Sequence, residues 1–148
     1  MSGLLAAAEP VERALPIAVI VAPGHVGVLR SSDLSLIYMR KKLFWPKGDR
    51  INPVNLPASH RLRQAFSRWV LGESPEEMEL YWNDMYFHGT SPPFVLGSPE
   101  AVLRFVAQTP GAVGYLSYCD VDARVKVALV LSENGPVSED AARQACAR

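Results

Sequence analysis

The residues best suited to bind a ligand are Ser59, His60, Arg61 and Arg63, which lie within one short segment. Apolar residues at helical spacing begin at Leu62, so these four side chains are expected where a loop enters a helix. Unpaired backbone N–H groups at a helix start, a hydroxyl group and two arginines are suited to hold an oxyanion. The alternative interpretation is an ordinary serine N-cap with solvated arginines.

No other group of residues matches a known catalytic or metal-binding pattern. The three histidines, His25, His60 and His88, are far apart in the sequence, and the motifs typical of serine hydrolases, zinc proteases and nucleotide-binding loops are absent. We therefore expect a protein that is not an enzyme and that uses no metal or cofactor. The alternative is a small hydrolase or transferase that uses His60 or His88, which requires a histidine within hydrogen-bond reach of Cys119 or of a buried serine.

The segment from residue 73 to residue 87 combines acidic and aromatic residues. Its glutamates fall in the first turn of an expected helix, where carboxylates offset the helix dipole, so we do not interpret them as metal ligands. Its apolar residues repeat at helical spacing, so we expect them to face the core rather than to form a ligand platform. The glutamates are Glu73, Glu76, Glu77 and Glu79, and the apolar residues are Met78, Tyr81, Trp82 and Met85.

The two cysteines, Cys119 and Cys146, are far apart and have no companion histidines at ligand spacing, which argues against a zinc site. They are either two free thiols or one bridge to the C-terminal tail. The geometry of the folded chain decides between these alternatives.

The composition indicates one ordinary folded domain. The 148 residues are 49% hydrophobic and 20% charged, and a chain of this length buries enough surface to fold without a metal ion. Fifteen basic and fifteen acidic residues cancel, so the composition gives no overall attraction to nucleic acid. No apolar run approaches the roughly 20 residues that span a bilayer, so membrane insertion is not expected. Residues 1–15 are interpreted as a flexible segment or the remnant of a signal peptide, because Ala6-Ala7-Ala8 has the small residues of a signal-peptidase site.

Apolar runs and helical stripes alternate along the chain. Strands that alternate with helices predict an α/β fold with a parallel or mixed sheet flanked by helices, spanning residues 16–131. Residues 132–148 are expected to be a tail or a short helix. Strands are predicted at residues 16–22, 51–55, 112–117 and 125–131, and helices are predicted to start near residues 31, 61, 74 and 98.

Polar residues mark the helix starts, and apolar stripes mark the core. Ser31, Ser32 and Asp33 are cap candidates for the first helix. Ser74 and Ser98 each precede a proline, and Glu77 follows Ser74 at the spacing of a capping box. One contiguous core is predicted to contain Leu62, Phe66, Trp69, Met78, Trp82, Phe105 and Val113.

An ordered set of segments is similar to the phosphate-binding proteins of bacterial ABC transporters. Leu36–Lys42 with Trp45-Pro46 resembles the family's "IYLGK…W", and Val106–Tyr115 resembles its "V..TPGAIGYV". Between them lie further matches, at Ile51–Asn55, Leu62–Phe66, Val70–Gly72 and Tyr81-Trp82. The set covers about residues 16 to 131 and resembles in particular the short, single-domain members. The resemblance implies one lobe of the periplasmic-binding-protein type, a periplasmic location and a role in phosphate transport.

The segment that corresponds to the family's phosphate loop differs from the family pattern. Leu56 stands in place of an arginine, and Ser59-His60-Arg61-Leu62 stand in place of GSGT. The chain is also too short for two full lobes, so an anion site would be half open, and binding is expected to be weak. The resemblance thus implies a phosphate or other oxyanion site at Ser59, His60, Arg61 and Arg63. The alternative is a protein-interaction module that has lost anion binding and binds a protein partner instead.

Overall fold

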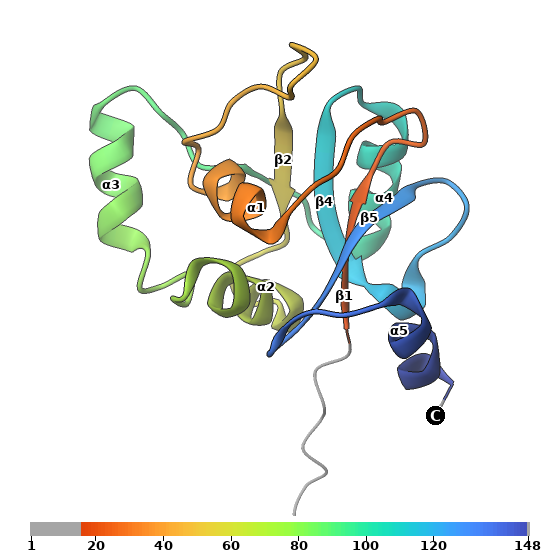
Figure 1. Cartoon of the computed structure of the whole chain (residues 1–148). Coiled ribbons are helices and arrows are strands. Elements are labelled where there is room, and N and C mark those ends of the chain that lie inside the picture. Colours follow the sequence, from red (N-terminus) through yellow and green to blue (C-terminus); the bar gives the residue numbers. More distant parts are fainter. Residues whose placement is uncertain (1–15, 148) are drawn as a thin grey trace, which may run out of the picture.

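The computed structural model describes residues 16–147, so the interpretation of residues 1–15 concerns a segment outside the described residues. A six-stranded sheet has the strand order β3-β2-β4-β1-β5-β6. Its strands β2, β4, β1 and β5 can be followed in Figure 1. Its strands are β1 (Ile17–Val21), β2 (Asn52–Asn55), β3 (Phe94–Val95), β4 (Ala112–Ser117), β5 (Lys126–Ser132) and β6 (Gly135–Pro136). The boundaries drawn at residues 15 and 131 stay a prediction.

The centre of the sheet forms where the sequence is most apolar. All five residues of β1 are buried, as expected for a strand covered on both faces. β1 runs antiparallel to both of its neighbours, β4 and β5, whereas β2 runs parallel to β3 and β4. The sheet is therefore mixed, and the predicted α/β class is confirmed.

Consecutive residues of β4 contact helices on opposite faces of the sheet, because side chains alternate along a strand. Gly114 faces α4 (Pro99–Gln108), and a Cβ atom at this position would lie 2.8 Å from Val102 Cγ1. Tyr115 faces α1 (Ser31–Tyr38), where its ring meets that of Tyr38 edge-on. Helices thus cover both faces of the sheet (Figure 1).

The predicted helix that starts at residue 61 has two parts. α2 (Arg61–Phe66) continues into a π-helical turn, η1 (Ser67–Leu71), which ends at Gly72. Gly72 has φ 78°, the left-handed conformation expected of a glycine C-cap.

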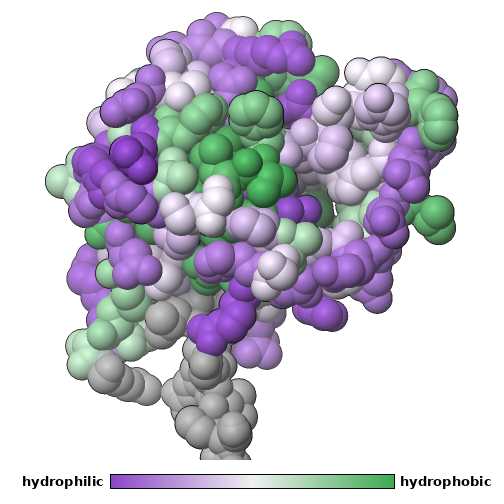
Figure 2. All heavy atoms as spheres, turned by 180° about the vertical axis from the view of Figure 1, so that it is seen from behind, coloured by the Kyte–Doolittle hydropathy of each residue, from purple (hydrophilic) through white to green (hydrophobic). Residues whose placement is uncertain are grey.

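The following helix, α3 (Glu79–Phe87), stands at one side of the molecule. The capping box predicted at Ser74 and Glu77 forms, but it closes a turn that precedes α3. No residue of α3 is buried, so the core prediction is wrong for Trp82. Met78, just before α3, is buried with 4% exposure but lies outside the main core. In the view from behind, a hollow separates this side of the molecule from the rest (Figure 2). The other five predicted residues lie in the core or pack against it, namely Leu62, Phe66, Trp69, Phe105 and Val113.

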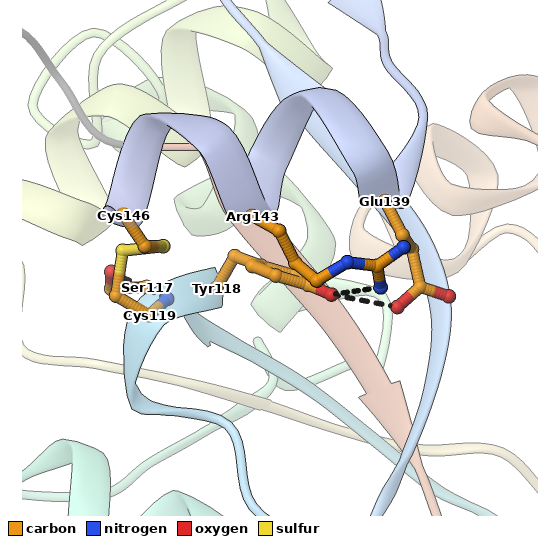
Figure 3. The surroundings of a disulfide bond; sticks show 6 residues. All are labelled: Ser117, Tyr118, Cys119, Glu139, Arg143 and Cys146. Carbon is orange, nitrogen blue, oxygen red and sulfur yellow. Dashed lines mark hydrogen bonds between the residues drawn. A yellow bond between two sulfur atoms is a disulfide. The ribbon is translucent and has the colours of Figure 1, made fainter. Parts of the chain in front are cut away.

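A disulfide bond attaches the C-terminal helix α5 (Glu139–Cys146) to the short 3-10 helix η2 (Tyr118–Asp120) that follows β4. Cys119 and Cys146 form this bond, so the structure has the bridge rather than two free thiols (Figure 3). The Tyr118 hydroxyl adds a second link, since it donates to Glu139 Oε1 over 2.9 Å. Residues 132–148 therefore contain a short helix, one of the two predicted alternatives.

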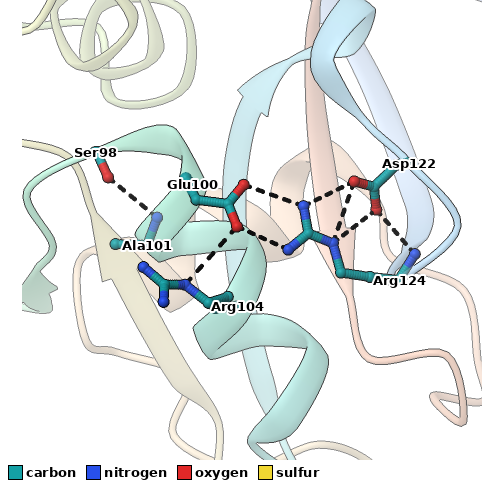
Figure 4. Close-up of polar contacts among 6 residues, drawn as sticks. All are labelled: Ser98, Glu100, Ala101, Arg104, Asp122 and Arg124. Carbon is teal, nitrogen blue, oxygen red and sulfur yellow. Dashed lines mark hydrogen bonds and ion pairs between the residues drawn. The ribbon is translucent and has the colours of Figure 1, made fainter.

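The caps of α1 and α4 differ in how well the sequence indicates them. Ser98 Oγ accepts from the Ala101 N–H over 3.1 Å, which confirms the predicted cap of α4 (Figure 4). For α1 the candidates at residues 31–33 are wrong, because Arg30 is the N-cap and Asp33 accepts from its backbone N–H. None of the helices within residues 16–147 has the length and apolarity needed to cross a membrane.

Candidate functional site

Three parallel strands end at one edge of the sheet, and each leads into a helix there. β2 leads to α2, β3 leads to α4, and β4 leads to η2. In open α/β sheets, ligands bind beyond the carboxyl ends of the strands. The predicted oxyanion segment, which joins β2 to α2, therefore lies at the edge where a binding site is expected.

Buried aromatic side chains hold the end of β2 in place. The Tyr115 hydroxyl donates to Asn55 Oδ1 over 2.7 Å and accepts the Leu56 N–H over 3.3 Å. The ring of Phe66 stacks on that of Tyr115 with centroids 3.8 Å apart. Burial raises the pKa of Tyr115 far above its usual value, so the hydroxyl keeps its proton and can make both contacts. The chain is thus held firmly just before the predicted site.

The structure separates the four predicted site residues. His60 is the N-cap of α2, where its Nδ1 accepts the Leu62 N–H over 3.1 Å. Arg63 turns the other way, and its Nη1 donates to the Leu56 carbonyl over 2.9 Å. Ser59 is exposed. Only His60 and Arg61 line the cleft at this edge.

This cleft has a volume of about 570 Å³ and lies between α2 and η2. Its first wall is one side of α2 and η1, and its second wall comes from η2, the start of α4 and the turn between β5 and β6. The first wall consists of His60, Arg61, Leu62, Gln64, Ala65, Arg68 and Trp69, and the second of Pro99, Ser117, Cys119, Asp120 and Glu133.

The two walls carry opposite charges. Arg61, Arg68 and His60 supply the basic groups of the first wall, whereas Asp120 and Glu133 are the acidic groups of the second. Arg68 was not predicted, although it follows Arg61 by two helical turns and so had to lie on the same side of the helix. The second wall offers no comparable signal, because its residues come from distant parts of the sequence. An anion that enters the cleft is therefore expected to bind against α2.

A second cleft, of about 490 Å³, lies where the 22–26 and 45–49 loops meet the segment between α4 and β4. His25 and Trp45 meet edge-on there, with ring centroids 4.6 Å apart, and Trp45 Nε1 donates to the Gly111 carbonyl over 3.0 Å. Partial burial and the nearby Lys126 and Lys47 lower the pKa of His25, which favours the neutral imidazole at pH 7. This cleft therefore lacks a histidine cation to attract an anion.

Among residues 16–147, no histidine makes a hydrogen bond to Cys119 or to a buried serine, although His60, Ser117 and Cys119 line the same cleft. Cys119 is held in the disulfide, so it carries no free thiol. His88 is exposed, and its Nδ1 contacts the Asp84 carbonyl over 2.8 Å. Across residues 16–147, no group of three or more His, Cys, Asp or Glu side chains is placed to hold a metal ion.

Comparison with known proteins finds similarity of structure. No family model matches the sequence, and no curated protein does either. A phosphate ABC transporter substrate-binding protein from Clostridium perfringens, solved with bound phosphate, superposes with a TM-score of 0.63 at 23% identity, over 76% of this chain and 44% of that one. An ABC-type phosphate transport receptor from Vibrio cholerae gives 0.63 at 22% identity, over 84% and 48%. PstS from Borrelia burgdorferi gives 0.54 at 17% identity, over 70% and 40%.

The chain thus spans less than half the length of each of these structures. At such identities the likeness concerns the fold. The resemblance noted in the sequence is confirmed at that level, and the chain has the periplasmic-binding-protein-like α/β fold found in phosphate-transport receptors.

Proposed function

We propose that this chain is a non-enzymatic lobe that binds a small oxyanion such as phosphate weakly, in the cleft between α2 and η2. The observation that supports the proposal is the grouping of His60, Arg61 and Arg68 on one wall of a cleft at the carboxyl edge of the parallel strands. The Clostridium perfringens protein of the same fold holds phosphate, which makes phosphate the first anion to test.

His60 has two tasks in this proposal. Its Nδ1 accepts the Leu62 N–H, so the neutral ring carries its proton on Nε2, which can donate to an anion. Protonation of Nδ1 would add charge but would remove the acceptor that caps α2. We therefore expect His60 to contribute its Nε2–H as a hydrogen-bond donor, with the two arginines supplying the positive charge.

Weak binding follows from the exposure and charge of the cleft. Arg61 and Arg68 are exposed, and ion pairs in water contribute only about 0–1 kcal/mol each. The carboxylates of Asp120 and Glu133 on the second wall also repel an anion that enters the cleft. Affinity should therefore fall as salt is added.

Calorimetric titration with phosphate and sulfate at low salt tests the site. Removal of either cleft arginine, by Arg61→Ala or Arg68→Ala, should weaken binding by up to about fivefold. Arg104→Ala is the matched control, because Arg104 lies on the exposed side of α4, outside the cleft. His60→Asn keeps an N-cap acceptor but removes the Nε2–H donor, so it separates helix capping from ligand binding.

Two results would reject this site. Saturable binding that neither Arg61→Ala nor Arg68→Ala changes would place the anion elsewhere. No detectable heat at millimolar phosphate or sulfate would show that the lobe does not bind these anions.

We also propose that the protein is exported to the periplasm. The Cys119–Cys146 disulfide supports this, since such bonds persist in oxidising compartments and are rare in the cytosol. Fractionation of the native host, combined with thiol labelling, tests the location. Protein found only in the cytosol, with both thiols reduced, would contradict export.

A further inference from the structure

The outward side of α3 carries large apolar residues beside carboxylates. Leu80 and Phe87 are 81% and 84% exposed, and Asp84 lies between them at helical spacing. Glu79 is exposed next to Leu80. We call Glu79, Leu80, Asp84 and Phe87 the acidic face. Folded monomers rarely expose neighbouring side chains of this size without a partner to cover them.

The charge of this region limits what can cover the face. Residues 72–93 contain five carboxylates and neither lysine nor arginine. Within residues 16–147, Asp84 has only His88 as an ion-pair neighbour, at 3.8 Å, and Glu79 has none. A surface that packs on the acidic face must therefore be both apolar and basic.

A surface with these properties exists on the same chain, in the segment that follows α1. We call Arg40, Lys41, Phe44 and Arg50 the basic turn. Phe44 is 52% exposed, and the guanidinium of Arg50 lies 5.7 Å from the centre of its ring. The basic turn thus combines cationic side chains with an exposed aromatic ring.

The two arginines of the basic turn have no carboxylate partner among the described residues. Arg40 has φ 62°, an uncommon conformation for a residue with a side chain, and its Nε is buried without a hydrogen-bond acceptor. Burial and the nearby Arg50 lower the pKa of Arg40, because they disfavour its charged form. A carboxylate from a second molecule would offset the repulsion between the guanidinium groups of Arg40 and Arg50.

The acidic face and the basic turn are neighbours in one molecule. The Tyr81 hydroxyl of α3 donates to the Met39 carbonyl over 2.7 Å, one residue before Arg40. A two-fold axis between the two surfaces would place each acidic face on the basic turn of the other copy, so that both contacts form at once and the assembly closes as a dimer. Contact between two acidic faces would instead bring like charges together.

We propose that the partner of the acidic face is a second copy of this chain, and that two copies form a symmetric dimer in which the acidic face of each lies on the basic turn of the other. The proposal does not depend on anion binding at the cleft, which lies at α2.

Sedimentation velocity from micromolar to millimolar protein tests the dimer. The 16.2 kDa chain should show a monomer–dimer equilibrium that shifts toward monomer as salt is added. Glu79→Lys with Asp84→Lys should weaken association more than about tenfold, and so should Lys41→Glu with Arg50→Glu, since each creates like-charge contacts. Asp140→Lys is the matched control, because Asp140 is an exposed carboxylate on α5 and belongs to neither surface.

Mixing the two reversed variants gives the decisive result. In the mixed dimer each reversed surface meets a surface of opposite charge, so association should return to the wild-type level. A wild-type chain that stays monomeric throughout, or a mixture that does not associate, would overturn the proposal. If a reversed variant does not fold, the milder Asp84→Asn and Lys41→Gln replace it, and wild-type-level dimerisation of both would equally overturn the proposal.

Discussion

Two helices of similar length, α4 and α3, differ in what covers their apolar residues. α4 buries Val102, Leu103 and Val106, and the bare Cα of Gly114 lets it approach the sheet. α3 buries no residue at all, although its sequence contains more aromatic residues than that of α4. Helical periodicity therefore predicts that a helix forms, while the presence of a surface to receive it decides whether its apolar side is buried.

The positions of the polar residues explain why burial was predicted correctly for α4 and not for α3. On α4 the outward positions Glu100 and Arg104 are charged, so only one side of the helix can face the core. On α3 large apolar residues occur on two sides, because Trp82 is half-buried while Leu80 and Phe87 are exposed. The predicted stripe on α3 is thus only partly buried, and it gave no sign of the exposed apolar residues.

The largest contrast is expected from truncating one leucine on each helix. Leu103→Ala should lower the free energy of unfolding by about 2–5 kcal/mol, because the 4% exposed side chain leaves a cavity. Leu80→Ala should change it by less than about 0.5 kcal/mol at concentrations where the chain is monomeric, since that side chain is already in water. Urea denaturation measures both values, and comparable losses would show that α3 is covered in the isolated chain.

The disulfide provides the next contrast, because α5 is attached covalently and α3 is not. Cys119 and Cys146 are 27 residues apart, and closing a loop of this length stabilises the folded state by about 3.5 kcal/mol in the chain-entropy model. The double substitution to serine should therefore lower the denaturation midpoint markedly. A reducing agent should do the same to the wild type and should leave the double variant unchanged.

Much of the fold could be predicted because the signals were local. The apolar run that became β1 is buried throughout, and the stripe of α2 placed Phe66 in the core. The strand β3 was missed because it has two exposed residues after Pro93, and it is a strand only through its pairing with β2. Such a pairing depends on a segment about 40 residues earlier in the chain, where Val54 lies opposite Phe94.

The candidate site was predictable on one wall only. His60 and Arg61 could be predicted as site residues because they lie at the start of a helix, and helical spacing from Arg61 would have added Arg68. Arg63 lies away from the cleft, because its guanidinium donates a hydrogen bond to the Leu56 carbonyl. Asp120 comes from a distant part of the chain, so no local pattern could have placed it opposite α2.

The two serine caps allow a smaller test of how firmly α3 is attached. Ser98→Ala and Ser74→Ala each remove a hydroxyl that accepts a backbone N–H, and each should cost about 1 kcal/mol. The two substitutions should differ in how much of the chain they destabilise. Amide hydrogen exchange should rise across the whole domain for Ser98→Ala, but mainly between residues 75 and 87 for Ser74→Ala. A uniform rise for both variants would mean that α3 opens only when the whole domain unfolds.

The smallest expected effect concerns the carboxylates beside α4, which are paired with arginines, whereas within residues 16–147 no arginine or lysine pairs with the carboxylates of α3. Hydrogen bonds and the charge of Arg124 lower the pKa of Asp122 to about 2, and Arg124 also lowers the pKa of Glu100 (Figure 4). Because the folded-state pKa of Asp122 lies below its ordinary value of 3.8, the stabilisation it gives is complete above that value and is lost as the pH falls toward 2.

Arg124→Gln should therefore return the pKa of Asp122 toward its ordinary value and make the stability less dependent on pH between about 4 and 2. A pH titration of the side-chain carboxyl signals by NMR, in wild type and variant, measures the shift directly. Asp33 supplies the internal control, since it pairs with Arg30 and not with Arg124, and its pKa is lowered, despite burial, by its hydrogen bonds from Arg30. The pKa of Asp33 should be unaffected by Arg124→Gln, and a shift at this carboxyl equal to that of Asp122 would show a long-range effect of net charge in place of a local ion pair.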